Sequence, residues 1–144
     1  MIDMKKQGDP PLGFLLSRAS ARLRTEVTDG LGPLGLTFSQ YLCMRVLSVN
    51  PGMSSAELAR ALNVSPQAMN TVLRGLEDIG AVSRPASVSV GRALPARLTA
   101  AGAALLERTD AVVHRAETAV LSGLTKAEQR ELKRMLASAG STTS

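Results

Sequence analysis

The sequence that decides the fold is SSAELARALNVSPQAMNTVLRGLEDIG, residues 54–80, which is expected to form two short helices joined by a tight turn. Ser54 followed by Glu57 is a capping-box pattern, in which the serine side chain accepts from the backbone at Glu57 and the glutamate reaches back to the cap. Ser65 is expected to cap the second helix, because Pro66 then takes the first helical position, where an N–H would have no intrahelical partner.

The second of these helices has two contrasting faces. Its apolar residues recur at intervals of three and four and are expected to pack inward: Met69, Val72, Leu73, Leu76 and Ile79. Its opposite face carries short hydrogen-bonding side chains and one arginine: Gln67, Asn70, Thr71, Arg74 and Asp78. Because such side chains can reach base edges in a DNA major groove, the pattern indicates a helix-turn-helix. A solvated helical hairpin is the alternative that fits the same residues.

The composition limits the class of protein. The chain has 144 residues, a net charge of +5 and a pI near 10.1, which favour one domain, with or without an added dimerisation element, and a polyanionic partner. A single cysteine, Cys43, and a single histidine, His114, exclude an intramolecular disulfide and a zinc cluster, and we expect no cofactor and no metal. No apolar run is long enough for a membrane span and no secretory signal is recognisable, so we expect a cytoplasmic protein.

The N-terminal third is expected to contain an arm and two helices. Residues 1–11 are expected to be a flexible arm, and residues 12–35 to contain a first helix that ends at glycines. Thr37 or Ser39 can cap the next helix, at roughly residues 38–49, and a turn follows it. The inward face of that helix is expected to consist of Cys43, Met44 and Leu47, with Tyr41 beside them.

After Gly80 the pattern changes from helical to extended. Residues 81–84 form a short extended piece, and residues 86–91 have the composition of a hairpin tip. We expect Pro95 to confine the returning strand to the edge of a sheet. This strand alternates apolar residues with others, as a half-buried strand should: Leu94, Ala96 and Leu98. A two-stranded hairpin directly after a recognition helix is a wing.

Arginines make the wing positively charged. Arg92, near the tip, is placed to enter a DNA minor groove. Arg84, at the base, is also expected to contact DNA, and Arg97 adds to the charge. The wing completes a winged helix-turn-helix domain that we assign to residues 36–99.

The C-terminal part is expected to contain two further helices. Thr99 can cap a long helix from about residue 100 to 122, and Thr125 with Glu128 forms a second capping box that opens a last helix. Residues 140–144 are expected to be a disordered tail. The apolar stripes of the terminal helices are too extensive for one small domain to cover, so residues 12–35 and 100–139 are assigned to two-fold dimerisation. A monomeric bundle that buries its own stripes is the alternative.

Several short sequence strings follow one another in a definite order over about residues 12–139. They are LT at 36–37 with QY at 40–41, SAELA at 55–59, Leu73, LE at 76–77, GAV at 80–82 with Arg84, LTAAG at 98–102 and LTKAEQ at 124–129. In order and spacing they resemble the MarR family of bacterial winged helix-turn-helix transcriptional regulators. The chain departs from the family at the wing, where Val90 takes the place of a common aspartate and Pro95 interrupts the usual strand, so we expect a wing that is more mobile or differently bent.

The resemblance implies a dimeric, nucleoid-associated repressor of a neighbouring gene, bound to a palindromic operator. It also implies release from DNA by a small aromatic or phenolic anion. This anion would be held between the dimerisation helices and the winged helix-turn-helix domain of residues 36–99, which we call the reading head. Candidate ligand-binding residues are Arg18 and Arg22, as cations for a carboxylate, and Tyr41, as a ring to stack. Oxidation of Cys43 is an alternative mechanism of the same family, although its apolar flanks favour a buried, unreactive thiol.

The function that we derive is therefore sequence-specific DNA binding. The predicted contacts to the major groove and its phosphates come from Ser65, Gln67, Asn70, Thr71 and Arg74, joined by Arg84 and Arg92 of the wing. An architectural or protein-interaction module without sequence preference is the alternative. We expect no enzyme, because the only histidine and the only cysteine are distant in sequence and no nucleophile–base pair converges.

Overall fold

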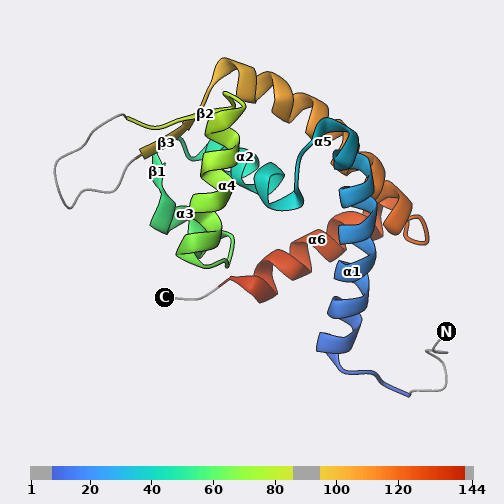
Figure 1. Ribbon diagram of the computed structural model, residues 1–144. Coiled ribbons are helices and arrows are strands. Elements are labelled where there is room, and N and C mark those ends of the chain that lie inside the picture. Colours follow the sequence, from blue (N-terminus) through green and yellow to red (C-terminus); the bar gives the residue numbers. More distant parts are fainter. Residues whose placement is uncertain (1–7, 86–94, 142–144) are drawn as a thin grey trace.

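The structure is a computed structural model that describes residues 8–85 and 95–141, and it is mainly helical. The elements are α1 (Leu12–Leu31), the short 3-10 helix η2 (Gly32–Leu34), α2 (Phe38–Val49), β1 (Met53–Ser54), α3 (Ser55–Ala61), α4 (Pro66–Asp78), β2 (Val82–Ser83), β3 (Pro95–Leu98), α5 (Ala100–Val120) and α6 (Lys126–Gly140). In Figure 1, α2, α3, α4 and the strands gather on one side and α1 lies on the other, while α5 spans both and α6 runs from near α1 back toward the first side.

Local capping determines where the helices begin, as the sequence predicts. Ser65 and Thr99 each accept a hydrogen bond from the backbone N–H three residues on, and complete capping boxes form at the other three predicted starts: Thr37, Ser54 and Thr125. Each cap satisfies backbone donors that the helix itself cannot. The predicted starts of five helices are therefore confirmed.

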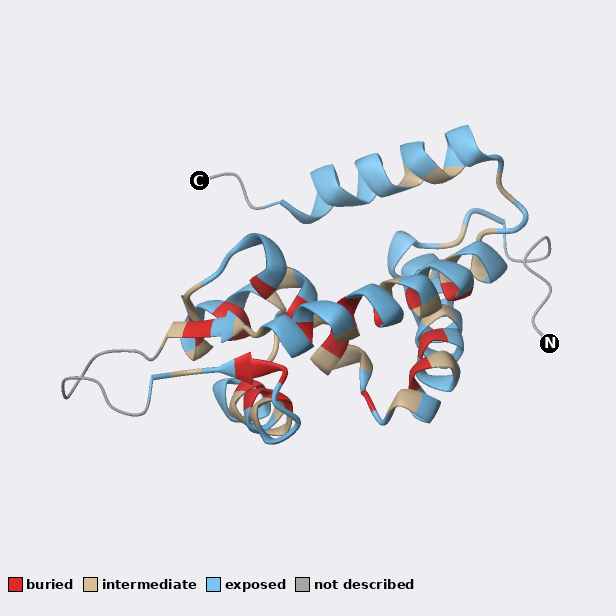
Figure 2. Ribbon diagram, turned by 90° about the horizontal axis from the view of Figure 1, so that it is seen from above, coloured by how far each residue is buried: buried red, intermediate tan, exposed pale blue. Residues whose placement is uncertain are grey.

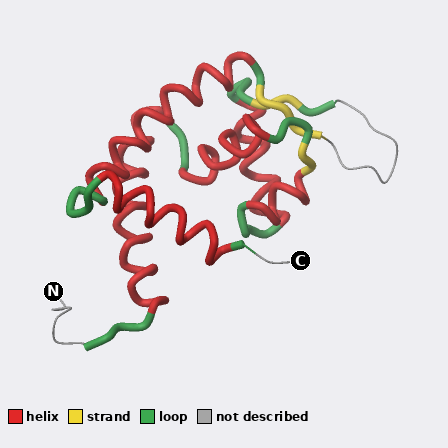
Figure 3. Tube along the Cα trace, turned by 180° about the vertical axis from the view of Figure 1, so that it is seen from behind, coloured by secondary structure: helices red, strands yellow, loops and turns green. Residues whose placement is uncertain are grey.

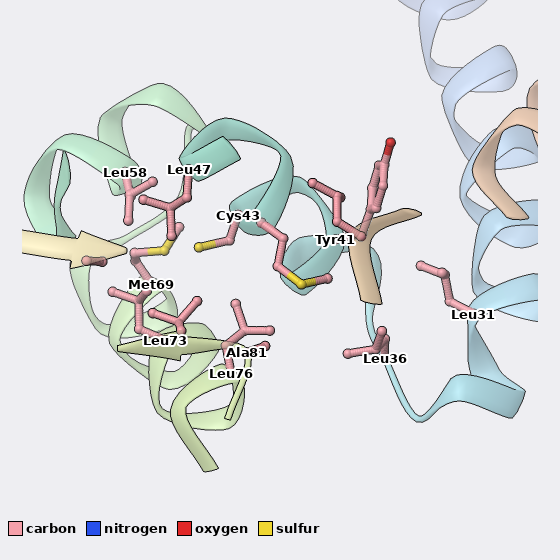
Figure 4. Packing of buried hydrophobic residues seen from close by; sticks show 14 of the residues in the cluster. Leu31, Leu36, Tyr41, Cys43, Leu47, Leu58, Met69, Leu73, Leu76 and Ala81 are labelled. Atoms are coloured by element: carbon pink, nitrogen blue, oxygen red, sulfur yellow. The ribbon is translucent and has the colours of Figure 1, made fainter. Parts of the chain in front are cut away.

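The core of the reading head lies between α2, α3 and α4. Figure 4 shows its side chains gathered against one another, and five of them are at most 1% exposed: Cys43, Leu47, Leu58, Met69 and Leu73. The expectation that Ile79 joins this core is wrong, because its side chain is 55% exposed. Ile79 is the C-cap of α4, with ψ of 3°, so the backbone has left the helix and its side chain no longer follows the inward face.

The strands form a small antiparallel sheet of order β1-β3-β2, with Ala96 of β3 fully buried. Figure 3 shows them together at one corner of the otherwise helical chain. The expectation that Pro95 makes its strand an edge strand is wrong, because β3 lies in the centre. Pro95 is tolerated at the first position of β3, where it faces Ser54 of β1, whereas the pairing with β2 begins only at Arg97. The hairpin tip, with Val90, Arg92 and Leu94, lies outside the described residues.

A close joint fixes α5 to the end of α4. The Thr99 hydroxyl donates to the Gly80 carbonyl oxygen at 2.5 Å, and the Thr99 N–H donates to the Ala81 carbonyl oxygen at 3.0 Å. Gly102 lies so near this backbone that a Cβ there would stand 2.0 Å from the Ala81 oxygen. Only glycine fits this approach, so α5 begins in direct contact with the backbone that follows α4.

The terminal helices are less well covered. Val27 and Leu31 of α1 are fully buried against the rest of the chain, but α6 has no buried residue. In Figure 2, α6 stands away from the buried parts of the molecule and is almost entirely exposed. Two hydrogen bonds from Gln129 Nε2 to the carbonyl oxygens of Leu121 and Leu124 hold its first turn. In the described parts of the chain, none of the helices is both long and apolar enough to cross a membrane.

Candidate nucleic-acid interface

The interface begins at the first turn of α4. The Ser65 hydroxyl oxygen accepts from the Ala68 N–H at 3.1 Å, and Pro66 follows as the first helical residue. The capping bond uses the serine oxygen as an acceptor, so the hydroxyl proton stays available to donate to a phosphate. A helix N-terminus also favours anions through its unpaired N–H groups. The predicted contact of Ser65 with the DNA backbone stays a prediction that is compatible with this capping geometry.

One stripe of α4 is exposed and polar. Gln67, Thr71 and Arg74 follow one another at intervals of four and three, and all three side chains are exposed. The Thr71 hydroxyl donates to the Gln67 carbonyl oxygen at 3.1 Å. Within residues 8–85 and 95–141, no ion pair occupies Arg74. The stripe is therefore free to present donors and acceptors to a base edge or a phosphate.

Asn70 differs from its neighbours on this face. Its side chain is half-buried, and its Oδ1 accepts a hydrogen bond from the Ser55 hydroxyl of α3 at 2.9 Å. Ser55 was not predicted as a site residue, because only the crossing of α3 over α4 brings together two residues that lie 15 apart in the chain. Asn70 is thus the one predicted major-groove residue that is bonded to the other helix of the motif.

Arg84 does not present a free guanidinium. Its Nε and Nη2 atoms both donate to Glu77 Oε1, at 2.9 and 2.6 Å, and its side chain is only 14% exposed. The bond joins the last turn of α4 to β2 and orients the base of the wing. Glu77 is a partner of Arg84 that the sequence did not predict, and the predicted contact of Arg84 with DNA stays a prediction. Arg92 lies outside the described residues.

The predicted ligand residues lie in two places. Tyr41 lines a cavity of about 410 Å³ between α2, α5 and α6, together with Arg45, Asp110, Val113, His114, Glu117 and Lys133. The Tyr41 hydroxyl donates to Asp110 Oδ1 at 2.7 Å, and Arg45 Nη1 lies 3.6 Å from the other oxygen. Burial, and then this bond to a carboxylate, raise the pKa of Tyr41. The phenol is a neutral donor, and the cavity holds cations that an anion could approach.

Arg18 and Arg22 do not line this cavity. The Arg18 guanidinium lies over the ring of Phe14, 5.8 Å from its centre, and Arg22 Nη2 donates to the Ala119 carbonyl oxygen at 3.3 Å. Within one chain, then, the structure does not bring the three predicted ligand residues together.

Cys43 is buried in the core beneath α4, and burial raises the pKa of its thiol to about 11. A buried thiol with a raised pKa stays protonated at neutral pH and is not accessible to an oxidant. This environment argues against the redox alternative. In the parts of the chain that the structure describes, no three His, Cys, Asp or Glu side chains cluster as metal ligands would.

Comparisons with known proteins agree with this arrangement. A sequence model of the MarR family matches residues 34–93. The HTH-type transcriptional repressor Rv2887 of Mycobacterium tuberculosis is 62% identical over 133 residues, which are 92% of this chain and 96% of the repressor. The crystal structure of the M. tuberculosis MarR family protein Rv2887 in complex with DNA has a TM-score of 0.79 at 57% identity, covering 92% of this chain and 100% of that one.

A second crystal structure of that protein, in complex with salicylic acid, has a TM-score of 0.75 at 60% identity and covers 93% of this chain and 99% of that one. The similarity therefore includes the terminal helices as well as the reading head.

Proposed function

The chain belongs to the MarR family of bacterial helix-turn-helix transcriptional regulators, and from that premise we propose a homodimeric repressor that binds a palindromic DNA operator and is released by a small aromatic acid. It acts at the nucleoid, in the cytoplasm of a bacterium. Family membership places the chain among transcription regulators, which are not an enzyme class.

The observation that carries the DNA-binding proposal is that α4 has one buried apolar face and one exposed polar face. Met69, Leu73 and Leu76 are fully buried and fix the helix from behind. The opposite stripe is exposed and polar, and a related repressor of similar structure is known in complex with DNA. A rigid helix with such a stripe fits the major groove, with Gln67 and Arg74 at base edges or phosphates.

Dimerisation is proposed from the uncovered apolar residues of the terminal helices. Large hydrophobic side chains remain 40–65% exposed on α1 and α6: Leu12, Leu15, Leu16, Met135 and Leu136. A second copy that covers them would also place two α4 helices on successive turns of a palindromic site.

The ligand is proposed to be an anion of the salicylate class, because a relative 60% identical to this chain is known in complex with salicylic acid. In this chain, a carboxylate near Tyr41 would compete with Asp110 for Arg45. Because α2 and α5 meet there, occupation of the cavity would change the angle between reading head and dimer helices. Arg18 and Arg22 stay candidates for the same ligand.

The experiment that tests the function is binding to the DNA upstream of the protein's own gene, against a random duplex of equal length. It is run at about 50 and 200 mM salt with wild type, Arg74→Ala and the control Arg130→Ala, an exposed arginine of α6. We expect wild type and the control to prefer the upstream DNA and Arg74→Ala to lose about tenfold in affinity. Equal affinity for both duplexes would contradict a specific repressor and favour the architectural alternative.

The ligand proposal is tested on the same complex by titration with salicylate. Release is expected in wild type, at a higher concentration in Arg45→Ala than in the Arg130→Ala control. Measuring Arg18→Ala and Arg22→Ala alongside decides whether either arginine contributes. An operator complex that salicylate and related aromatic acids leave intact would contradict ligand-controlled release without affecting the DNA-binding proposal.

A further inference from the structure

We propose that Ser55 fixes the orientation of the Asn70 carboxamide, so that Asn70 presents only N–H donors to DNA and selects guanine over adenine at the base it contacts. The proposal rests on the proposed function of α4 as the reading helix. It assigns Asn70 as a specificity-determining residue and Ser55, on the other helix of the motif, as the positioning residue that controls it.

The first step is the geometry of the pair. Ser55 is the first residue of α3, and its Oγ lies 2.9 Å from Asn70 Oδ1. Both side chains are half-buried where the two helices cross. The hydroxyl donates and the amide oxygen accepts, so the oxygen of the carboxamide is turned toward α3. The Nδ2 end, with its two protons, therefore points away from that bond.

The second step is that Ser55 itself is held in place. The preceding residue, Ser54, is buried and accepts from the Glu57 N–H at 3.1 Å, while Glu57 Oε1 accepts from the Ser54 N–H at 3.2 Å. Ser54 also pairs with Pro95 in the sheet. The capping box and the strand pairing anchor the backbone on which Ser55 stands.

The third step is that the opposite amide orientation reverses the direction of the bond. Rotating the carboxamide by 180° would turn its nitrogen toward Ser55 Oγ, and the serine could then only accept. Among the described residues, Asn70 Oδ1 is the acceptor that the hydroxyl proton reaches, so rotation would leave that proton without a protein partner. The structure therefore has the orientation in which the Ser55 hydroxyl proton keeps a protein acceptor and the amide nitrogen is left for DNA.

The consequence concerns which base Asn70 can read. In the major groove, adenine presents N7 as an acceptor and N6 as a donor, and a free Asn side chain matches both with its oxygen and its nitrogen. Guanine presents two acceptors, N7 and O6. A carboxamide that offers only N–H groups matches guanine, and it meets the adenine amino group with a second donor.

The test is the base preference of the purified full-length protein on its operator. Each position of one half-site is changed in turn to all four base pairs, and relative affinities are measured for wild type, Asn70→Ala, Ser55→Ala and the matched control Ser55→Thr, which keeps the hydroxyl. Asn70→Ala identifies the position that Asn70 reads. There we expect wild type and Ser55→Thr to favour guanine over adenine by about tenfold.

Ser55→Ala is expected to reduce that ratio at least threefold, because the released amide can rotate to accept from adenine. A purely structural defect would weaken all operators equally and leave the ratio unchanged. An adenine preference in wild type, an unchanged ratio in Ser55→Ala, or no position sensitive to Asn70→Ala would each overturn the proposal while specific DNA binding stands. Equal binding of wild type to the operator and to random DNA would instead overturn the proposed function, and this inference with it.

Discussion

Two amphipathic helices of this chain, α4 and α6, differ in whether the same chain buries their apolar residues. In α4 the apolar residues Met69, Leu73 and Leu76 are fully buried by the chain's own α2 and α3. In α6 the corresponding stripe stays open, with Met135 49% and Leu136 42% exposed. An apolar stripe in a sequence shows that a helix needs a partner, but it does not show whether the same chain supplies it.

The ion pairs of the two helices differ in the same way. Glu77 of α4 and its partner Arg84 have side chains 34% and 14% exposed, whereas Lys133 of α6 and its partner Glu117 are 62% and 30% exposed. Removing one partner of a charge pair that is shielded from water costs more stability than doing so in a hydrated pair, because the remaining charge stays desolvated. The apolar residues and the ion pair of α4 are therefore shielded from water within one chain, whereas those of α6 stay exposed.

The largest expected difference between the two helices is the loss of stability when an apolar side chain of each is truncated. Leu73→Ala is expected to lower the free energy of unfolding by about 2–5 kcal/mol, because it leaves a cavity in a closed core. Leu136→Ala, the matched truncation on α6, is expected to lower it by less than about 1.5 kcal/mol, and by an amount that varies with protein concentration. Urea unfolding at two concentrations checks both. Equal losses that are independent of concentration would mean that α6 is already covered.

The second expected effect concerns what covers α6. Leu136→Asp is expected to raise the dimer dissociation constant about 10–100-fold, since a charge then enters the apolar contact. Ala127→Asp is the control, because Ala127 lies on the opposite side of the same helix, nine residues away. Sedimentation equilibrium measures both variants. A dimer that tolerates Leu136→Asp as well as Ala127→Asp would show that another surface joins the two copies.

The third expected effect separates the two ion pairs. Arg84→Met is expected to lower the free energy of unfolding by about 1–2 kcal/mol, because Glu77 loses a shielded charged partner. Lys133→Met is expected to change it by no more than about 0.5 kcal/mol. A double-mutant cycle with Glu77→Gln isolates the first pair. A coupling energy near zero would show that the Glu77–Arg84 pair adds no stability, and would contradict this difference between the two ion pairs.

Sequence reasoning succeeded where the cause is local. The capping residues Thr37, Ser65 and Thr125 begin helices as predicted, because a cap depends on side chains only three residues apart. It failed at Pro95, because the two-residue strand β1 that makes β3 central has no periodicity to detect. The partners of Arg84 and Asn70 were missed for a related reason, since each bond joins two elements whose packing no spacing rule gives.

The smallest expected effect tests whether the core beneath α4 is closed to water. Burial raises the pKa of Cys43 from an ordinary 9.0 to about 11. Between these values the unfolded chain loses the thiol proton and the folded chain keeps it, so stability should fall as the pH rises, by at most about 1.4 kcal/mol per pH unit. At about pH 8 and lower the thiol contributes almost no pH dependence, because it is protonated in both states.

The measurement is urea unfolding of wild type and Cys43→Ala at pH 7, 9 and 10.5, read as the difference between the two proteins. Tyr41, whose pKa is also raised, is present in both and cancels. The difference in stability is expected to move in favour of Cys43→Ala by only about 0.4 kcal/mol between pH 7 and 9, and by more at pH 10.5. Alkylation by iodoacetamide at pH 8 should be at least tenfold slower in the folded protein than in urea. Rapid alkylation of the folded protein would mean that the core beneath α4 opens readily to solvent, and would contradict the contrast between a closed core at α4 and an exposed α6.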